Sequence, residues 1–142
     1  MPIYAQLMCE DYNKRIDNQP FVKSDFYREP TKFESTFMNF AKKADMYIAC
    51  HYWHAHNPYI LTRSDLKNAD CKIKVIGDIS CDIDGPVGST IRPSTIKEPL
   101  YGYDPVSECE VNFSDESAIT CMAVDNLPCE LPLDASEDFG KT

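Results

Sequence analysis

Apolar residues along this chain recur with two different periods, which predict helices and strands in turn. A stripe at helical spacing runs from Phe33 to Ala41, and the capping box of Thr31 and Glu34 marks its start. A second helix is expected near Thr62, where Asp65 lies at the same capping distance. Short apolar runs predict three buried strands, at residues 45–50, 73–79 and 118–124.

The order of these elements is helix, strand, helix, strand, with short connections, which favours an α/β fold with a parallel sheet. Residues 83–117 differ because four prolines interrupt them. We expect an excursion there that contains a small β-ribbon, in which 100–103 pair with 111–113. A short strand at 3–8 and a last helix beginning near Pro132 complete the prediction.

Polar side chains follow each of the three predicted strands. His51 and Tyr52 follow the first, Ser80 to Asp82 follow the second, and Asp125 and Asn126 follow the third. Parallel strands place their carboxyl ends at one edge of the sheet, where ligands bind in open α/β folds. The sequence therefore predicts a binding site at this edge.

The densest group of candidate residues follows the second strand, where three acids fall within seven residues, Asp78, Asp82 and Asp84. In the functional interpretation, Asp82 binds a substrate ammonium or a cofactor hydroxyl. In the alternative, the segment is a turn in which Asp78 only caps a backbone amide, because Asp, Gly and Pro commonly form turns. Gly85 and Gly88 are expected to be turn glycines. Spacing alone leaves both interpretations open.

Metal binding and nucleophilic catalysis are two further kinds of chemistry to consider for residues at the same strand ends. Three imidazoles, of His51, His54 and His56, could bind zinc, but no cysteine or acid lies nearby at zinc-finger spacing, so we expect no metal. A loop of amphipathic residues lining a pocket fits better, with Tyr52 able to contact a planar ring or ribose. Cys81 is not expected to be a nucleophile, because its acidic neighbours disfavour the thiolate.

The composition of the chain limits which binding partners and which cellular compartment we expect. With 23 acidic and 14 basic residues the net charge is -9, which disfavours nucleic acid and anionic membranes. The chain has no run of 18 apolar residues, so no membrane-spanning helix is expected. The start, Met1 to Ala5, does not resemble a signal peptide. Seven cysteines without a C-x-x-C pair predict reduced thiols in a cytoplasmic protein.

Two blocks of the chain resemble saccharopine dehydrogenases, including the lysine–ketoglutarate reductase half of the animal bifunctional enzyme. Residues 78–82, Asp-Ile-Ser-Cys-Asp, match the D-[VI]-S-x-D segment of that family. Residues 124–128 and 131–139 are similar to its I-D-[HN]-L-P and L-P-x-[ED]-A-[ST]-E-x-F segments. Residues 61–63, Leu-Thr-Arg, are similar to the animal reductase. The wider group includes alanine dehydrogenase and transhydrogenase.

The resemblance implies the second half of a Rossmann-type parallel sheet with flanking helices. The chain would divide into an irregular lead-in (1–30), the C-terminal half of the dinucleotide-binding domain (31–130) and the start of a helix returning to the substrate domain (131–142). The five glycines form no G-x-G-x-x-G, and in this family the glycine-rich turn and the catalytic lysine and histidine lie upstream. No catalytic residue is therefore expected within this chain.

The family also implies roles for individual residues. The cofactor-binding residues, with NAD or NADP as cofactor, would be Tyr52, Ile79, Val124, Asp125, Asn126 and Leu127. The substrate-binding residues would be Ser80, Cys81 and Asp82. Cys50 would be a free thiol, because the upstream cysteine with which its counterpart pairs in the fungal enzyme is absent.

The implied reaction moves a hydride to or from an imine formed between an amino acid and a 2-oxo acid. One alternative is an alanine dehydrogenase-like enzyme with a smaller substrate. Another is a non-catalytic nucleotide-binding or remnant domain. A half-domain would expose an apolar sheet edge, so we expect this chain to associate with the rest of an enzyme or with itself.

Overall fold

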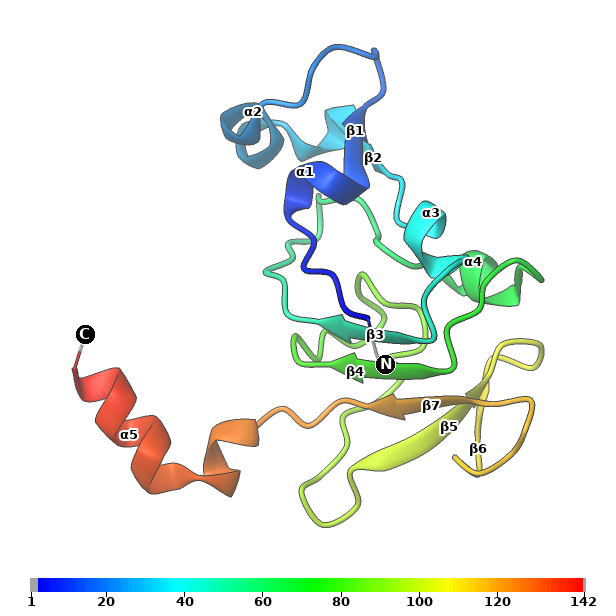
Figure 1. Cartoon of the computed structure of the whole chain (residues 1–142), viewed down its shortest axis with the longest axis vertical. Coiled ribbons are helices and arrows are strands. Elements are labelled where there is room, and N and C mark those ends of the chain that lie inside the picture. Colours follow the sequence, from blue (N-terminus) through cyan, green and yellow to red (C-terminus); the bar gives the residue numbers. More distant parts are fainter. Residues whose placement is uncertain (1–2, 142) are drawn as a thin grey trace.

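The computed structural model describes residues 3–141. The predicted segments 1–30 and 131–142 extend beyond these limits, by Met1 and Pro2 at one end and by Thr142 at the other. Its centre is a sheet with the strand order β3-β4-β7-β5-β6 (Figure 1). The strands are β3 (Met46–Ala49), β4 (Val75–Asp78), β7 (Ile119–Met122), β5 (Leu100–Asp104) and β6 (Cys109–Val111). Because β3, β4 and β7 run parallel, the predicted α/β class and its three strands are confirmed.

The predicted β-ribbon forms, but it is part of the main sheet and not an excursion. Strands β5 and β6 pair antiparallel, and β5 also pairs antiparallel with β7. Tyr101 and Tyr103 of β5 are buried in the core, which accounts for this docking. A Cβ at Gly102 would lie 2.5 Å from the carbonyl oxygen of Asn112, so only glycine fits where the two strands of the ribbon approach.

The helix predicted from Phe33 to Ala41 is only half right. Phe33 begins a strand, β2 (Phe33–Ser35), which pairs antiparallel with β1 (Asn13–Arg15), and Thr31 lies in the 3-10 turn η1 (Pro30–Lys32). The ring of Phe33 packs 5.2 Å from that of Phe26 and 5.4 Å from that of Phe21. This distant aromatic contact overrides the local helical pattern, and the helix is confined to α3 (Met38–Ala41).

The lead-in contains more structure than its polar sequence suggests. The strand expected at 3–8 is absent, because these residues are irregular and Ile3 and Tyr4 lie in solvent. The described part of the lead-in instead forms α1 (Cys9–Tyr12), β1 and α2 (Lys23–Arg28).

The second predicted helix is confirmed as α4 (Arg63–Lys67). Its capping box is the one read from the sequence: the Asp65 amide donates to the Thr62 hydroxyl at 3.1 Å, and the Thr62 amide donates to the Asp65 carboxylate at 2.9 Å. Leu66 then points into the core. Because the cap fixes where α4 begins, it also fixes the position of Arg63, which the site uses.

The two faces of the sheet differ in burial. Tyr47, Ile76, Cys121 and Tyr101 form one row across four strands and belong to the core. Side chains of the alternate rows point to the other face, where Met46 is 56% and Ile48 58% exposed. The strand at 45–50, predicted as buried, is therefore buried on one side only.

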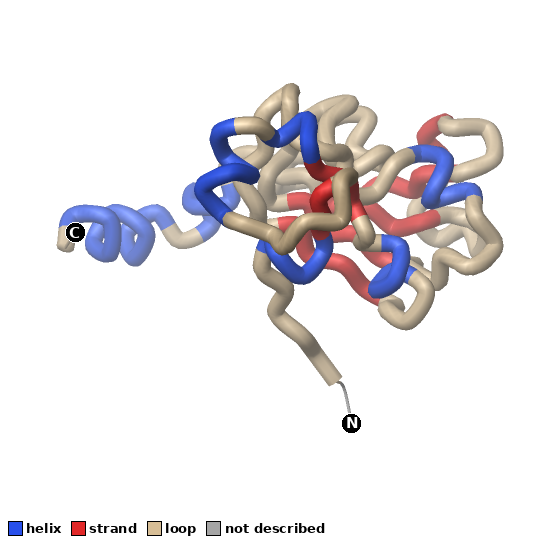
Figure 2. The backbone as a smooth tube through the Cα atoms, turned by 90° about the horizontal axis from the view of Figure 1, so that it is seen from above, coloured by secondary structure: helices blue, strands red, loops and turns tan. Residues whose placement is uncertain are grey.

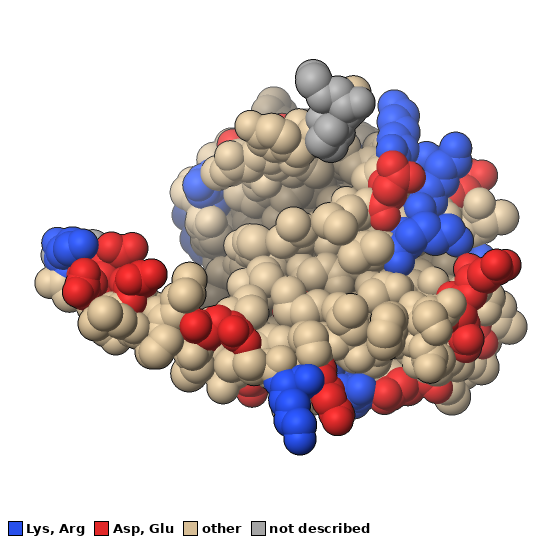
Figure 3. Space-filling model, turned by 60° about the horizontal axis from the view of Figure 1, so that its bottom comes forward, with Lys and Arg blue, Asp and Glu red and all other residues tan. Residues whose placement is uncertain are grey.

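The C-terminal segment leaves the body of the molecule. After the 3-10 turn η2 (Leu127–Glu130) the helix α5 (Pro132–Gly140) stands clear of the remaining elements (Figure 2). Its start at Pro132 confirms the predicted last helix. Figure 3 shows acidic side chains gathered on this projecting helix, while the body in the same view carries its charges mostly toward the margins. Leu131 and Leu133 are exposed along it.

Candidate functional site

The sheet register brings the three polar strand ends to one edge. Ala49 of β3 is opposite Asp78 of β4, and the Ile79 amide donates to the Ala49 carbonyl at 2.9 Å. Gly77 of β4 is opposite Met122 of β7, so the third strand ends at the same level. The predicted convergence of these ends is therefore confirmed.

Asp78 is a structural residue in the centre of this edge. It is 1% exposed, and its two carboxylate oxygens accept four hydrogen bonds. The Thr90 hydroxyl donates to one oxygen at 2.6 Å; the Ser80 hydroxyl donates to the other at 2.5 Å, together with the amides of Ser80 and Cys81. Its carboxylate is thus committed to the loop that follows β4. For Asp78 the turn interpretation is confirmed.

Asp82 lies on a tight turn just beyond. The Gly85 amide donates to the Asp82 carbonyl at 2.9 Å, and a Cβ at Gly85 would lie 2.5 Å from the Cβ of Asp82, which confirms Gly85 as a turn glycine. Cys81 and Asp84 both have left-handed backbone angles, with φ of 54° and 52°. The Asp82 carboxylate has no hydrogen-bond or ion-pair partner among residues 3–141. Burial, with the nearby charge of Asp78, raises the pKa of Asp82.

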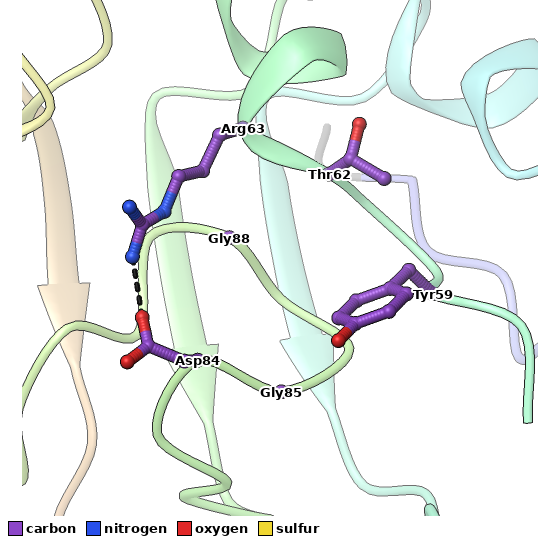
Figure 4. Close-up of a pocket in the computed structure, with 6 residues that line it drawn as sticks. All are labelled: Tyr59, Thr62, Arg63, Asp84, Gly85 and Gly88. Atoms are coloured by element: carbon purple, nitrogen blue, oxygen red, sulfur yellow. Dashed lines mark hydrogen bonds and ion pairs between the residues drawn. The ribbon is translucent and has the colours of Figure 1, made fainter. Parts of the chain in front are cut away.

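Arg63 anchors this turn through an ion pair with Asp84. Arg63 forms an ion pair with Asp84 across an open pocket of about 550 Å³ (Figure 4). A second Arg63 nitrogen lies 3.3 Å from Glu108, which also pairs with Lys67. From the sequence, Arg63 was noted only as part of the Leu-Thr-Arg similarity. Its function as an anchor depends on contacts 21 and 45 residues away in the chain, which no local pattern reveals.

Gly88 brings the loop after β4 close to the start of α4. A Cβ at Gly88 would lie 2.5 Å from the backbone nitrogen of Arg63, and the Gly88 amide donates to the Leu61 carbonyl at 2.8 Å. Any larger residue would push the loop away from the helix. Gly88, expected as a turn glycine, is therefore needed for this close approach.

Cys81 lies among the acids of the edge. Burial first, and then the charges of Asp78, Asp125 and Asp82, raise the pKa of its thiol to about 11. This confirms that its neighbours disfavour the thiolate. All seven cysteines are free thiols, and Cys50 is exposed. Asp125 and Asp82 therefore both act electrostatically on the same thiol.

The third strand end contributes one buried and two exposed predicted residues. Val124 is buried and forms a parallel bridge to Ser94, so its side chain belongs to the core. Asp125 and Asn126 are exposed, and Leu127 is half-buried at the start of η2. The Asp125 carboxylate has no hydrogen-bond or ion-pair partner among the residues that the structure describes. This end therefore presents Asp125 and Asn126 to solvent.

Tyr52 is placed differently. Its side chain is 83% exposed and lines a second open pocket of about 530 Å³. The other residues of this pocket are Tyr27, Arg28, Glu29, Pro30, Thr31, His54, His56 and Asn57. The predicted pocket-lining loop is thus observed, but the structure groups Tyr52 with the N-terminal segment and not with Asp82 or Asp125.

His51 is the residue whose burial the sequence did not predict. Its Nε2 is buried and has no hydrogen-bond partner. Burial lowers the pKa of the imidazole, against the opposing charges of Asp78 and Asp82, so the ring is neutral at pH 7. Within the described ranges, no three His, Cys, Asp or Glu side chains are grouped so that they could hold a metal ion.

Comparison with known proteins places the chain beside enzymes of lysine breakdown. No protein-family model matches it. It is 29% identical over 127 residues to the alpha-aminoadipic semialdehyde synthase of Arabidopsis thaliana, a match covering 87% of this chain and 12% of the plant protein. The mouse mitochondrial enzyme of the same name is 26% identical over 143 residues, covering 83% of this chain and 15% of that enzyme.

These matches confirm the resemblance to lysine–ketoglutarate reductases and saccharopine dehydrogenases, and the chain spans only a small part of the length of these relatives. The expectation of a cytoplasmic protein is wrong, because the mouse, rat and bovine relatives are all named as mitochondrial. Reduced cysteines indicate a reducing environment but do not distinguish one such compartment from another. Among residues 3–141, no helix combines the length and apolarity that crossing a membrane requires.

Proposed function

We propose that this chain supplies the second half of the nucleotide-binding domain of an NAD(P)-dependent enzyme of lysine breakdown. The observation that carries the proposal is the common edge of β3, β4 and β7, where Asp82 and Asp125 present carboxylates that no other described side chain uses. Unpaired carboxylates at the carboxyl ends of parallel strands are suited to ribose hydroxyls and to cationic substrate groups. The names of the relatives favour lysine-derived substrates over alanine.

The cofactor side of the site would consist of residues after β3, after β4 and after β7. These are Tyr52, Ile79, Val124, Asp125, Asn126 and Leu127. Val124 can contribute only its main chain, because its side chain is buried. The Ile79 amide is already bonded to Ala49. When bound, the nicotinamide supplies the hydride chemistry, and these residues orient it.

The substrate side would be the turn from Ser80 to Asp82. The Ser80 hydroxyl is bonded to Asp78, and the Cys81 thiol stays protonated, so Asp82 is the one charged group of the three that is open to a ligand. An amino-acid substrate or the imine derived from it carries a cationic nitrogen. Asp82 would hold that nitrogen while the catalytic acid and base come from outside this chain.

The chain would act together with further polypeptide. The alternate rows of the sheet expose Met46, Ile48 and Leu100 on one face, although parallel sheets are ordinarily covered on both faces. The missing cover is either the rest of an enzyme or a second copy of this chain. The protein also lacks a G-x-G-x-x-G turn, so the cofactor phosphates would be bound by such further polypeptide.

Calorimetric titration of the full chain with NADH, and separately with NADPH, tests the proposal. We expect saturable binding of one of them, weakened about fivefold or more by Asp125→Ala because a hydrogen bond to a charged group is lost. Asp115→Ala is the matched control, since Asp115 lies in the turn before β7, at the opposite end of the strand. If Asp125→Ala and Asp115→Ala bind the nucleotide with equal affinity, or if neither nucleotide binds, the proposed role is refuted.

A further inference from the structure

Asp84 and Gly85 form the one Asp-Gly pair of the sequence, and this pair lies in the turn that carries Asp82. An Asp-Gly pair can rearrange without an enzyme. The glycine nitrogen attacks the side-chain carboxyl carbon of the aspartate, one water molecule leaves, and a cyclic succinimide forms. Hydrolysis of the ring by one water molecule then gives either aspartate or isoaspartate, in which the main chain runs through the former side chain. Glycine favours the attack because it has no side chain to shield its nitrogen.

Two features of the turn expose Asp84 to this chemistry. Its side chain is 70% exposed, so water reaches the carboxylate. Its φ of 52° lies in the left-handed region, at the third position of the turn that the Gly85 amide closes on the Asp82 carbonyl. Glycine or asparagine ordinarily takes a turn position with positive φ. Asp84 is therefore both open to solvent and held in a conformation that L-residues rarely adopt.

Two contacts keep the reacting atoms apart in the folded chain. The carboxylate of Asp84 pairs with Arg63 and is directed toward the guanidinium, on the side away from Gly85 (Figure 4). Gly85 is buried, and its nitrogen donates to the Asp82 carbonyl at 2.9 Å. The nitrogen can reach the carboxyl carbon only after both contacts open.

We propose that Asp84 is a modification site, which isomerises spontaneously to isoaspartate at a rate that the ion pair with Arg63 limits. This inference does not depend on the proposed function, because it concerns only the chemistry of the turn. Isoaspartate adds one carbon atom to the main chain before Gly85. The turn has no room for it, since even a Cβ at Gly85 would lie 2.5 Å from the Cβ of Asp82 and 2.6 Å from its carbonyl oxygen. The modified turn must therefore change shape and move Asp82.

The test stores the full chain at neutral pH in water enriched in oxygen-18, both folded and unfolded in guanidinium chloride. The endoprotease Asp-N, which cuts before aspartate but not before isoaspartate, then reports isomerisation in a peptide map. We expect the peptide that stays uncut at position 84 to carry one heavy oxygen atom. It should form more slowly in the folded chain than in the unfolded one.

Two matched controls separate the parts of the proposal. Arg63→Ala should accelerate isomerisation of the folded chain about fivefold or more, because the turn opens more often. Arg92→Ala, which removes an ion pair of similar exposure, should leave the rate unchanged. Within each sample, Asp70 is 63% exposed and paired with Lys42, but cysteine follows it instead of glycine. In the unfolded chain Asp70 should isomerise more slowly than Asp84.

Each comparison has an outcome that would overturn its part of the inference. Equal rates in Arg63→Ala and Arg92→Ala would remove the role of Arg63. Isomerisation of the folded parent chain as fast as in guanidinium chloride would show that the turn restrains nothing, and this measurement covers a failure of Arg63→Ala to fold. Equal rates at Asp70 and Asp84 in the unfolded chain, or no uptake of heavy oxygen, would refute the succinimide route.

Discussion

Thr90 donates its hydroxyl hydrogen to the buried carboxylate of Asp78 at 2.6 Å. This bond joins the end of β4 to a residue 12 positions later in the chain and so closes the loop that carries Asp82. The loop is held at its base by this contact and at its outer side by Arg63. Both contacts lead to measurable predictions.

Replacement of Thr90 by valine should destabilise the protein by about 1–3 kcal/mol. The substitution keeps the shape of the side chain but removes the donor to one oxygen of a buried carboxylate, which then has no hydrogen-bond partner. Urea unfolding measures the change. Thr95→Val is the control, because the Thr95 hydroxyl only accepts an exposed bond from the Glu98 amide. Equal decreases in the free energy of unfolding of the two variants would show that the buried hydrogen bond contributes no more to stability than the exposed one.

Replacement of Arg63 by alanine should loosen the turn that carries Asp82. Without the pairs to Asp84 and Glu108, we expect hydrogen exchange of the Gly85 amide to accelerate about fivefold or more, with little change in global stability. Arg92→Ala removes a similar pair, with Glu110, and the Arg63 and Arg92 side chains are 39% and 38% exposed. If Arg92→Ala accelerates the same amide equally, Arg63 does not anchor the turn.

Cys81 should resist alkylation at pH values where exposed cysteines react. With a pKa of about 11, the thiol is ionised to about one part in a thousand at pH 8, and iodoacetamide attacks the thiolate. Mass-spectrometric mapping should therefore show exposed Cys50 and Cys109 modified first, with Cys81 following only near pH 10–11. Asp82→Asn should lower the pH needed. Early modification of Cys81 at pH 8 would contradict its placement among acids.

The half-buried imidazole of His51 should make stability depend on pH. Its folded pKa lies below the unfolded value near 6.5, so the unfolded state binds the proton more readily, and stability falls as the pH drops below about 6.5. The slope for one proton is at most about 1.4 kcal/mol per pH unit. Urea unfolding at pH 7.5 and 5.5 should show a smaller difference for His51→Asn than for the parent protein. An identical difference in both would mean that His51 titrates normally.

The exposed face of the sheet should cause association. Light scattering of the full chain is expected to show oligomers, and Ile48→Lys should reduce them by placing a charge on the exposed apolar face of an edge strand. Val106→Lys is the matched control, since Val106 is also apolar and exposed, at 83% against 58% for Ile48, but lies in the turn between β5 and β6. A monomeric parent protein would contradict the prediction.

Sequence predicted those features that depend on neighbours in the chain. The cap of α4 was readable because Thr62 and Asp65 lie three residues apart. The parallel orientation of β3, β4 and β7 was readable because helices alternate with strands along the chain. Phe33 was misread because its packing against Phe21 and Phe26 is decided by the fold of the N-terminal segment.

The site was predicted in outline for the same reason. Three polar strand ends had to meet once the strands were parallel. One carboxylate oxygen of Asp78 is hydrogen-bonded by Thr90, which lies 12 residues further along the chain. The Nε2 of His51 has no hydrogen-bond partner because of how the surrounding residues pack. The spacing of residues in the sequence predicts neither feature. Tyr52 adjoins a strand end in sequence, yet its side chain turns toward another surface.

Strands β3, β4 and β7 form the contiguous parallel part of the described sheet, and this part has a free edge at β3. On its other side β7 pairs antiparallel with β5, so a further strand that extends this parallel part would have to join beside β3. His51 and Tyr52 come two and three residues after the end of that strand. Whatever completes the sheet would thus bring its own loops next to the imidazole, and the two halves of a ligand cleft would meet there.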